Sequence, residues 1–199
     1  MKTLLLTLTI LITTSITAMS QNIEEIIGQV KSKFAPDKRT AIFDISYIQE
    51  GDELILKGEV SEKIFKDELL KELKSKTNFK IIDDIDFLPS SKIGPRIFGI
   101  VNLSVCNIRS KPDHPEELST QALMGTPVRI LKEKDGWFLI QTPDEYLGWV
   151  DEDGFARKTA EEMIDWINSN KIIYTKWFGF IIPTKILMKK LAMWLQEIF

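Results

Sequence analysis

The stretch from Phe98 to Phe155 constrains the fold most, because short strand-like runs alternate there with strong turn signals. The segment Asn107–Pro115 contains two prolines and several turn-forming residues, which excludes a helix at that point. The Asp-Gly pair within Lys134–Gly136 favours a tight hairpin. Strand-like runs at this spacing, without a helical period, predict a small β-barrel over residues 97–157. The runs are Phe98–Val105, Val128–Leu131, Trp137–Gln141 and Glu145–Val150.

Residues 21–88 predict a separate unit in the order strand, strand, helix, strand. A short helix beginning at Asn22, with apolar residues on one face, precedes it. Residues 40–60 alternate between apolar and polar and turn back on themselves, Ser61 is expected to cap the next helix, and residues 79–87 return as a third strand. One helix can cover one face of a three-stranded antiparallel or mixed sheet, so the unit is expected to be ββαβ.

Two further segments complete the predicted α+β organisation. Residues 89–96 contain two prolines and a glycine and are expected to be a linker. Residues 158–180 begin with a capping box at Thr159–Glu162, which predicts a helix, and Lys171–Thr175 has the composition of a strand. We therefore expect the ββαβ unit, then the barrel, then a C-terminal helix.

The first 20 residues have the features of a cleavable export signal. Lys2 gives a positive start, Leu4–Ile16 is too short for an ordinary membrane span, and Ala18 and Ser20 provide small residues ahead of a cut before Gln21. No cysteine comes directly after the cut, so we do not expect lipid anchoring. An uncleaved anchor is the alternative, and a periplasmic or secreted protein is the expectation.

The motifs between Asn107 and Asp151 resemble those of a known family. They are N-x-R-S-x-P-D at 107–113, G-T-P-V at 125–128, D-G-W-F-x-I-Q-T-P-D at 135–144 and Y-x-G-W-V-D at 146–151. Together they resemble a bacterial-type SH3 domain, in particular the one that precedes the catalytic domain in NlpC/p60 cysteine peptidases of the cell wall. The resemblance covers residues 97–180 and implies that the barrel is SH3-like.

This resemblance implies a ligand and residues that bind it. NlpC/p60 enzymes cut the γ-D-glutamyl to diamino acid bond of peptidoglycan stem peptides, and their SH3 domain borders the catalytic groove. A tyrosine in a G-Y-x-G-W setting helps to shape the pocket there, and it corresponds to Tyr146, although Glu145 replaces the preceding glycine. The predicted partner is a stem peptide or a peptidase domain. The predicted ligand-binding residues are Tyr146, Trp149, His114 and Arg109; alternatively, Trp149 packs in the barrel core with Trp137.

The chain has one cysteine and one histidine, which limits its chemistry. The related peptidases place their nucleophile in a D-C-S-G-like motif with a histidine base nearby, and no such motif is present. Cys106 is expected to be a small buried apolar residue, although a Cys106–His114 dyad is conceivable. One cysteine with one histidine does not make a metal cluster. We therefore expect no catalysis, no metal and no cofactor.

Net charge and the C-terminal residues bear on the remaining partners. The formal net charge is −3, without a basic excess, which does not favour nucleic acid, and we expect a monomer. Residues 181–199 fit a basic amphipathic helix that could lie on a membrane surface. Alternatively they are an out-of-frame tail, because permissible codons read two nucleotides later encode a peptide similar to the corresponding segment of the related peptidases. The chain would then be a truncated peptidase.

Three functions are therefore open. The first is a non-catalytic cell-wall recognition and targeting module, as the N-terminal fragment of an NlpC/p60 peptidase. The second is a stand-alone periplasmic adaptor that binds proteins. The third is a membrane-surface protein that acts through its C-terminal amphipathic helix.

Overall fold

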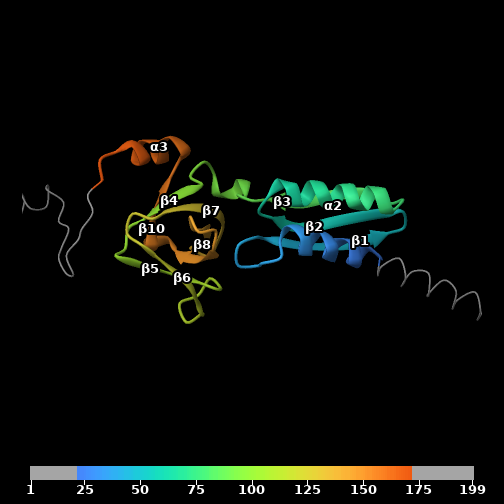
Figure 1. The fold of residues 1–199 in the computed structure, drawn as a ribbon, viewed down its shortest axis with the longest axis horizontal. Helices are drawn as coiled ribbons and strands as arrows, with labels where there is room; N and C mark the ends of the chain where they lie inside the picture. The colour runs from blue at the N-terminus through green and yellow to red at the C-terminus, as the bar shows by residue number, and fades with distance from the viewer. Residues whose placement is uncertain (1–21, 172–199) are drawn as a thin grey trace, which may run out of the picture. The chain divides into compact units, whose positions relative to one another are not determined.

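The computed structural model describes residues 22–171. The predicted export signal, nearly all of the predicted strand at 171–175 and the tail at 181–199 lie outside the described residues. Residues 22–167 fall within one compact unit that contains two β-sheets (Figure 1). No helix within 22–171 is long and apolar enough to cross a membrane.

The first sheet has three strands in the order β1-β2-β3. β1 and β2 form an antiparallel hairpin, and β3 pairs with β2 in parallel. A parallel pair needs a crossover, which α2 supplies between the two strands. The order of strand, strand, helix and strand is therefore as expected, and the sheet is mixed. The bounds are β1 Phe43–Glu50, β2 Glu53–Val60, α2 Lys63–Lys76 and β3 Lys80–Phe87.

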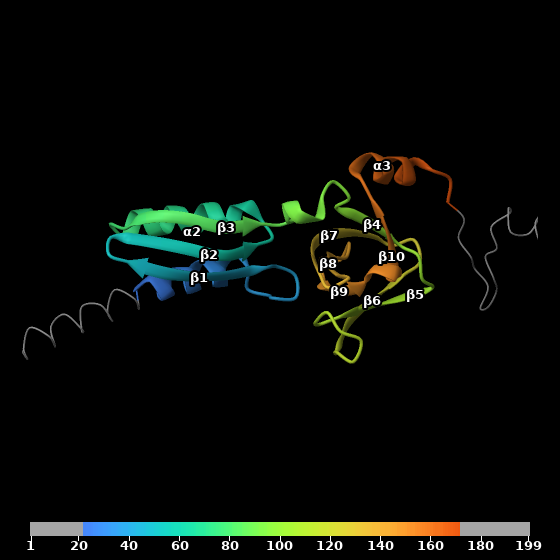
Figure 2. The same ribbon diagram turned by 180° about the vertical axis from the view of Figure 1, so that it is seen from behind.

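One face of this sheet carries a hydrophobic core beneath two helices. The helix at residues 22–34 and α2 both contribute buried residues to it, among them Ile23 and Leu69. Strand alternation directs Phe43, Leu54 and Ile85 towards those helices. Figure 2 shows the three strands in front with the helices behind them, so the opposite face of the sheet is seen directly.

The start of α2 differs from the prediction that Ser61 caps it. The N-cap residue is Glu62, and its side chain makes no capping hydrogen bond. Ser61 is instead buried, and its hydroxyl accepts a hydrogen bond from the Ile42 backbone N–H at 3.0 Å. The prediction was wrong because this N–H precedes β1 and needs a partner of its own once it is buried.

The second sheet has seven antiparallel strands in the order β10-β4-β7-β8-β9-β5-β6. Among the described residues β10 and β6 are the two ends, and no pairing joins them, so hydrogen bonds do not close the predicted barrel. Residues from both ends nevertheless enter one core, including Phe155 of β10 and Ala122 of β6. The bounds are β4 Phe98–Val101, β5 Val105–Arg109, β6 Leu118–Leu123, β7 Pro127–Lys134, β8 Trp137–Gln141, β9 Leu147–Asp151 and β10 Phe155–Lys158.

Segments next to the second sheet also take part in its packing. Residues 89–96, expected as a linker, contain the short helix η1 (Ser91–Ile93), and Ile93 is buried in the core of this sheet. A second short helix, η2 (Glu152–Gly154), leads from β9 into β10. The helix predicted after the sheet is α3 (Ala160–Asn168), and its capping box forms as expected between Thr159 and Glu162.

A third buried cluster lies where the ββαβ unit meets the second sheet; we call it the junction cluster. It consists of the buried Leu88, Leu131, Leu139 and Leu147, with Ile42 and Trp149 partly buried against them. Hydrogen bonds surround it. The Leu147 N–H donates to the Arg39 carbonyl at 2.7 Å, and the Gln141 side-chain amide donates to the Thr40 carbonyl at 3.0 Å.

Candidate functional site on the outer face of β8 and β9

The candidate site is the face of β8 and β9 that points away from the core of the second sheet. Phe138, Ile140 and Val150 fill that core, so the alternate residues of both strands point outwards. The register aligns these outward residues directly across the two strands. The pairs are Trp137 with Asp151, Leu139 with Trp149, and Gln141 with Leu147.

Three of the four predicted ligand-binding residues gather on this face. Arg109 is paired with Trp149 across β5 and β9, and it points outwards because Ile108 lies in the core. His114, in the loop between β5 and β6, packs its ring edge-on to Trp137 with the ring centroids 4.9 Å apart. Its Nε2 lies 3.7 Å from a carboxylate oxygen of Asp151. Strand register therefore brings Arg109 to Trp149, and a loop contact brings His114 to Trp137.

Tyr146, the fourth predicted residue, lies at the junction end of the face. It precedes β9, and its carbonyl accepts hydrogen bonds from both the N–H and the hydroxyl of Thr142. The Arg39 guanidinium lies over its ring, 5.9 Å from the centroid. The ring of Tyr146 therefore contacts Arg39 of the ββαβ unit, and its backbone is held by Thr142.

Trp149 lies between the end of the face that carries His114 and the end that carries Tyr146, and it is only partly buried. One side of it packs on the junction cluster, and the Lys132 ammonium lies 5.7 Å from the centroid of its ring. Trp137, in contrast, is 9% exposed. Of the two tryptophans, Trp137 is the buried one and Trp149 keeps accessible ring surface.

Glu145 takes over the backbone role that the related motif gives to glycine. Its φ is +69°, in the left-handed region where a side chain is unfavourable by about 1–2 kcal/mol. Its carbonyl accepts a hydrogen bond from the Gln141 side chain at 3.1 Å, and its N–H donates to the Thr142 carbonyl at 2.9 Å. The turn that presents Tyr146 therefore forms even though glycine is replaced.

The cations around this face differ in how far they are neutralised. Lys132 is paired with Glu59 of the first sheet. Arg39 is paired with Asp37 at 2.7 Å, and its side-chain and backbone hydrogen bonds lower the pKa of that carboxyl from 3.8 to about 2. Arg109 instead donates to the Glu116 carbonyl at 2.8 Å. Its charge is thus available to an anionic group of a ligand.

Cys106 lies on the other side of the sheet from this face. It is 2% exposed, and burial raises the pKa of its thiol, with the negative charge of Asp151 acting in the same direction. The exposed His114 ring lies on the outer face, so the conceivable Cys106–His114 dyad is not assembled. Within residues 22–171, no three metal-binding side chains of His, Cys, Asp or Glu converge.

Sequence reasoning missed the residues that the ββαβ unit and β7 bring to this face, namely Arg39 and Lys132, and it also missed Leu139. One signal was present. Residues 137–140 are four apolar residues without alternation, and all four are buried. Such a run indicates a strand covered on both faces, so it points to a partner on the outer side of β8.

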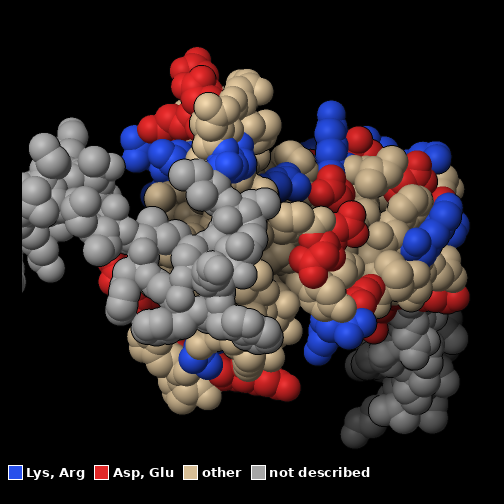
Figure 3. All heavy atoms as spheres, turned by 60° about the vertical axis from the view of Figure 1, so that its left-hand side comes forward, with Lys and Arg blue, Asp and Glu red and all other residues tan. Residues whose placement is uncertain are grey.

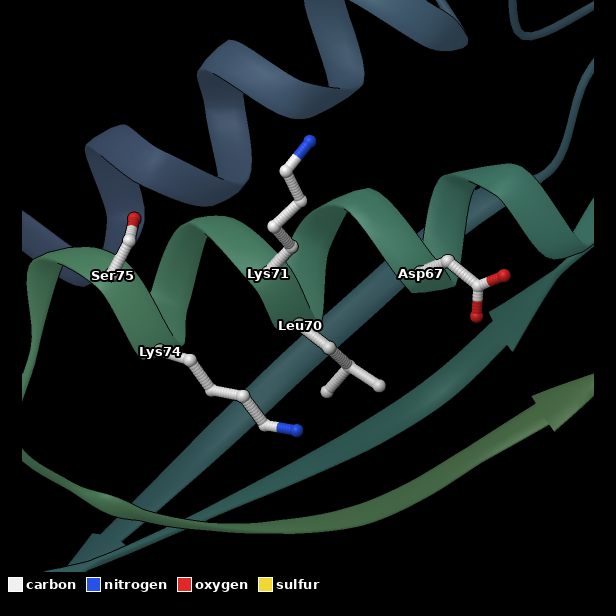
Figure 4. A pocket seen from close by; sticks show the side chains of 5 residues that line it. All are labelled: Asp67, Leu70, Lys71, Lys74 and Ser75. Carbon is white, nitrogen blue, oxygen red and sulfur yellow. The ribbon is translucent and has the colours of Figure 1, made fainter.

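Other surface features offer less chemistry. The hollow drawn in Figure 4 is lined by residues of α2 alone, and one of them, Lys71, is paired with Glu68. Figure 3 shows Lys and Arg interspersed with Asp and Glu among the described residues on the viewed face, without a continuous basic stripe. The lining residues of the hollow are Asp67, Leu70, Lys71, Lys74 and Ser75.

Comparison with known families supports a bacterial-type SH3 domain in this part of the chain. Residues 108–155 match the family model of the bacterial dipeptidyl-peptidase SH3 domain. The matched residues include Arg109, His114, Tyr146 and Trp149, hence all four predicted binding residues. We refer to the second sheet as the SH3 domain from here on. A search of curated proteins found no relative that matches the chain.

Proposed function

We propose that this chain is a non-catalytic, exported module that recognises peptidoglycan stem peptides through the outer face of β8 and β9. The observation that carries the proposal is the convergence of Arg109, His114 and Trp149 on one face within the matched SH3 region. Cell-wall association agrees with a family model that describes bacterial dipeptidyl-peptidase SH3 domains. The export signal proposed for residues 1–20 would bring the chain to that ligand.

The chemistry of the face suits a short peptide rich in carboxylates. The Arg109 guanidinium can donate to a ligand carboxylate, and the exposed ring surface of Trp149 can cover an apolar side chain. Asp151, beside His114, can accept from the amino group of a diamino acid. The register of β5 and β9 sets Arg109 beside Trp149, and the contacts of His114 with Trp137 and Asp151 hold the β5–β6 loop next to them.

The same proposal assigns no hydrolysis to the chain itself. A cysteine nucleophile acts as the thiolate, and the buried Cys106 has its pKa raised. We further propose, on the sequence resemblance alone, that the module serves an NlpC/p60-type catalytic domain, which would supply the nucleophile. Hydrolysis of L-Ala-γ-D-Glu-diaminopimelate that is lost in Cys106→Ala would contradict this assignment.

Binding of that tripeptide, measured by calorimetry and by tryptophan fluorescence, tests the recognition role. Arg109→Gln should weaken binding about tenfold, because it removes a charge-assisted contact. Arg96→Gln is the matched control, since Arg96 is paired with Glu162 of α3, away from the outer face of β8 and β9. Loss of binding in Arg109→Gln alone supports the proposal. Equal binding by both variants, or no binding by the parent chain, would overturn it.

A further inference from the structure

The uncovered face of the first sheet carries an apolar row at its centre. Ile48 of β1, Ile55 of β2 and Ile82 of β3 lie directly opposite one another in the strand registers. They alternate with the residues that face the two helices, so all three point to the uncovered side. Ile48 is 45% exposed, and the other two are half-buried.

Among the described residues this row has no covering element. None of the three isoleucines belongs to a buried cluster, and Figure 2 shows no helix in front of the strands. The pairing of β2 and β3 is parallel, and sheets that are wholly parallel are covered on both faces, whereas this mixed sheet has one face open among the described residues. The arrangement therefore fits a face that a partner covers.

The same face is rich in carboxylates, which favours a partner that carries positive charge. Carboxylates outnumber cations on both sides of the row, and two of them are neutralised, Glu53 by Lys80 and Glu59 by Lys132. The others have no ion pair within the described residues. The outward charged residues are Asp44, Glu50, Glu53, Glu59, Asp84 and Asp86, with Lys57 and Lys80.

We propose that this face docks a basic amphipathic helix of another protein. Strands lie about 4.8 Å apart, and helix positions three to four residues apart advance about 5 Å, so apolar residues at i, i+4 and i+7 match the spacing of the three isoleucines. Lysine and arginine flanking that apolar stripe then lie over the carboxylates. A second copy of this face would instead meet it with like charge, as would an anionic membrane or nucleic acid.

This surface adjoins the outer face of β8 and β9 at the Glu59–Lys132 pair, because Lys132 also lies over the Trp149 ring. The isoleucine row itself takes no part in the peptide-binding proposal. It gives the chain two binding surfaces, one in each sheet. An adaptor role thus has a specific structural basis in the first sheet.

A designed helical peptide of leucine and lysine, with leucines at i, i+4 and i+7, is a suitable probe for the full-length chain. We expect amide NMR shifts along β1, β2 and β3, and binding that weakens as salt is added. A peptide of the same composition with the leucines scattered should bind about tenfold more weakly, because it has no apolar stripe.

Variants of the chain decide between this face and general charge attraction. The double variant Asp84→Lys/Asp86→Lys, and separately Ile55→Ser, should each weaken the peptide about tenfold. The matched control is Glu161→Lys/Asp165→Lys on the exposed side of α3, which makes the same change in net charge. Equal weakening in the control, or shifts that map elsewhere, would overturn the proposal. So would a dimer of the chain that Ile55→Ser dissociates, because the occupant would then be a second copy.

Discussion

The two sheets of this molecule use strand alternation in different ways. The first sheet places its apolar residues against two helices and leaves the other face to a row of isoleucines among charges. The SH3 domain coils around its own core and also buries residues on its outer side, where Leu131, Leu139 and Leu147 meet the ββαβ unit.

Burial in the first sheet is set by strand alternation, whereas burial on the outer side of the SH3 domain is set by packing with distant segments. In the first sheet, burial follows from the period of a single strand, so it can be assigned from local sequence. On β7 and β8, neighbouring residues such as Ile130 and Leu131 are both fully buried although they point to opposite sides. Their burial depends on what the rest of the chain brings to each side.

The largest expected effect comes from comparing Leu131→Ala with Ile130→Ala. Both side chains are 0% exposed, one in the junction cluster and one in the SH3 core. Each change should lower the free energy of unfolding by about 2–5 kcal/mol, which denaturant titration measures. If Leu131→Ala costs less than about 0.5 kcal/mol, the junction is not formed in solution.

A smaller effect is expected from Gly148→Ala, which acts within the SH3 domain alone. A methyl group there would lie 2.4 Å from a side-chain carbon of Ile108 and 3.0 Å from the Arg109 carbonyl oxygen. We expect a loss of about 1–3 kcal/mol in the free energy of unfolding. Gly28→Ala is the counterpart in the helix at residues 22–34, where an added methyl group meets nothing within 4 Å, and it should raise the free energy of unfolding by about 0.5–1 kcal/mol.

Glu145→Gly should stabilise the chain by about 0.5–1 kcal/mol, because it relieves the left-handed backbone at this residue. Gly125→Ala is the reverse change at a φ of +86° and should destabilise by a similar amount. Thermal unfolding of both variants tests the pair. A fall in stability for Glu145→Gly would show that the side chain of Glu145 contributes more than its backbone costs.

The smallest effect concerns pH and the pair between Asp37 and Arg39. Because the pKa of Asp37 in the folded chain is about 2, below 3.8, this group stabilises the fold at neutral pH and loses that contribution as the pH falls from about 4 towards 2. Arg39→Ala should return the pKa of Asp37 towards 3.8. NMR titration of the carboxyl carbon measures this, and a parent value close to the ordinary one would mean that the pair does not persist.

Much of the fold can be predicted from the sequence because its signals are local. The hairpin of residues 40–60, the Asp-Gly turn and the capping box at Thr159 each need only neighbouring residues, and each is present. The prediction for Ser61 failed because a distant N–H, that of Ile42, takes up its hydroxyl. The prediction of a closed barrel failed for a similar reason. Whether β6 and β10 pair depends on how strongly the whole sheet coils, which no local segment of the sequence determines.

The candidate site likewise has a part that local sequence predicts and a part that depends on long-range contacts. The motif residues Arg109, His114, Tyr146 and Trp149 could be chosen from the sequence, and all of them lie in the matched region. Their grouping could not, because the register between β5 and β9 sets Arg109 beside Trp149 and a loop contact sets His114 on Trp137. The contribution of Arg39 was also hidden, since it comes from the other unit.

The segment between the two sheets has a practical consequence for anyone dividing this polypeptide. Ile93 fills part of the SH3 core, its carbonyl receives a hydrogen bond from Arg157 at 2.6 Å, and the Ser90 N–H donates to the Leu131 carbonyl. A recombinant fragment that starts at Phe98 would therefore lack Ile93, which is part of the SH3 core. A fragment that starts upstream of Leu88 keeps Ile93, and it also retains Leu88, one of the four leucines of the junction cluster.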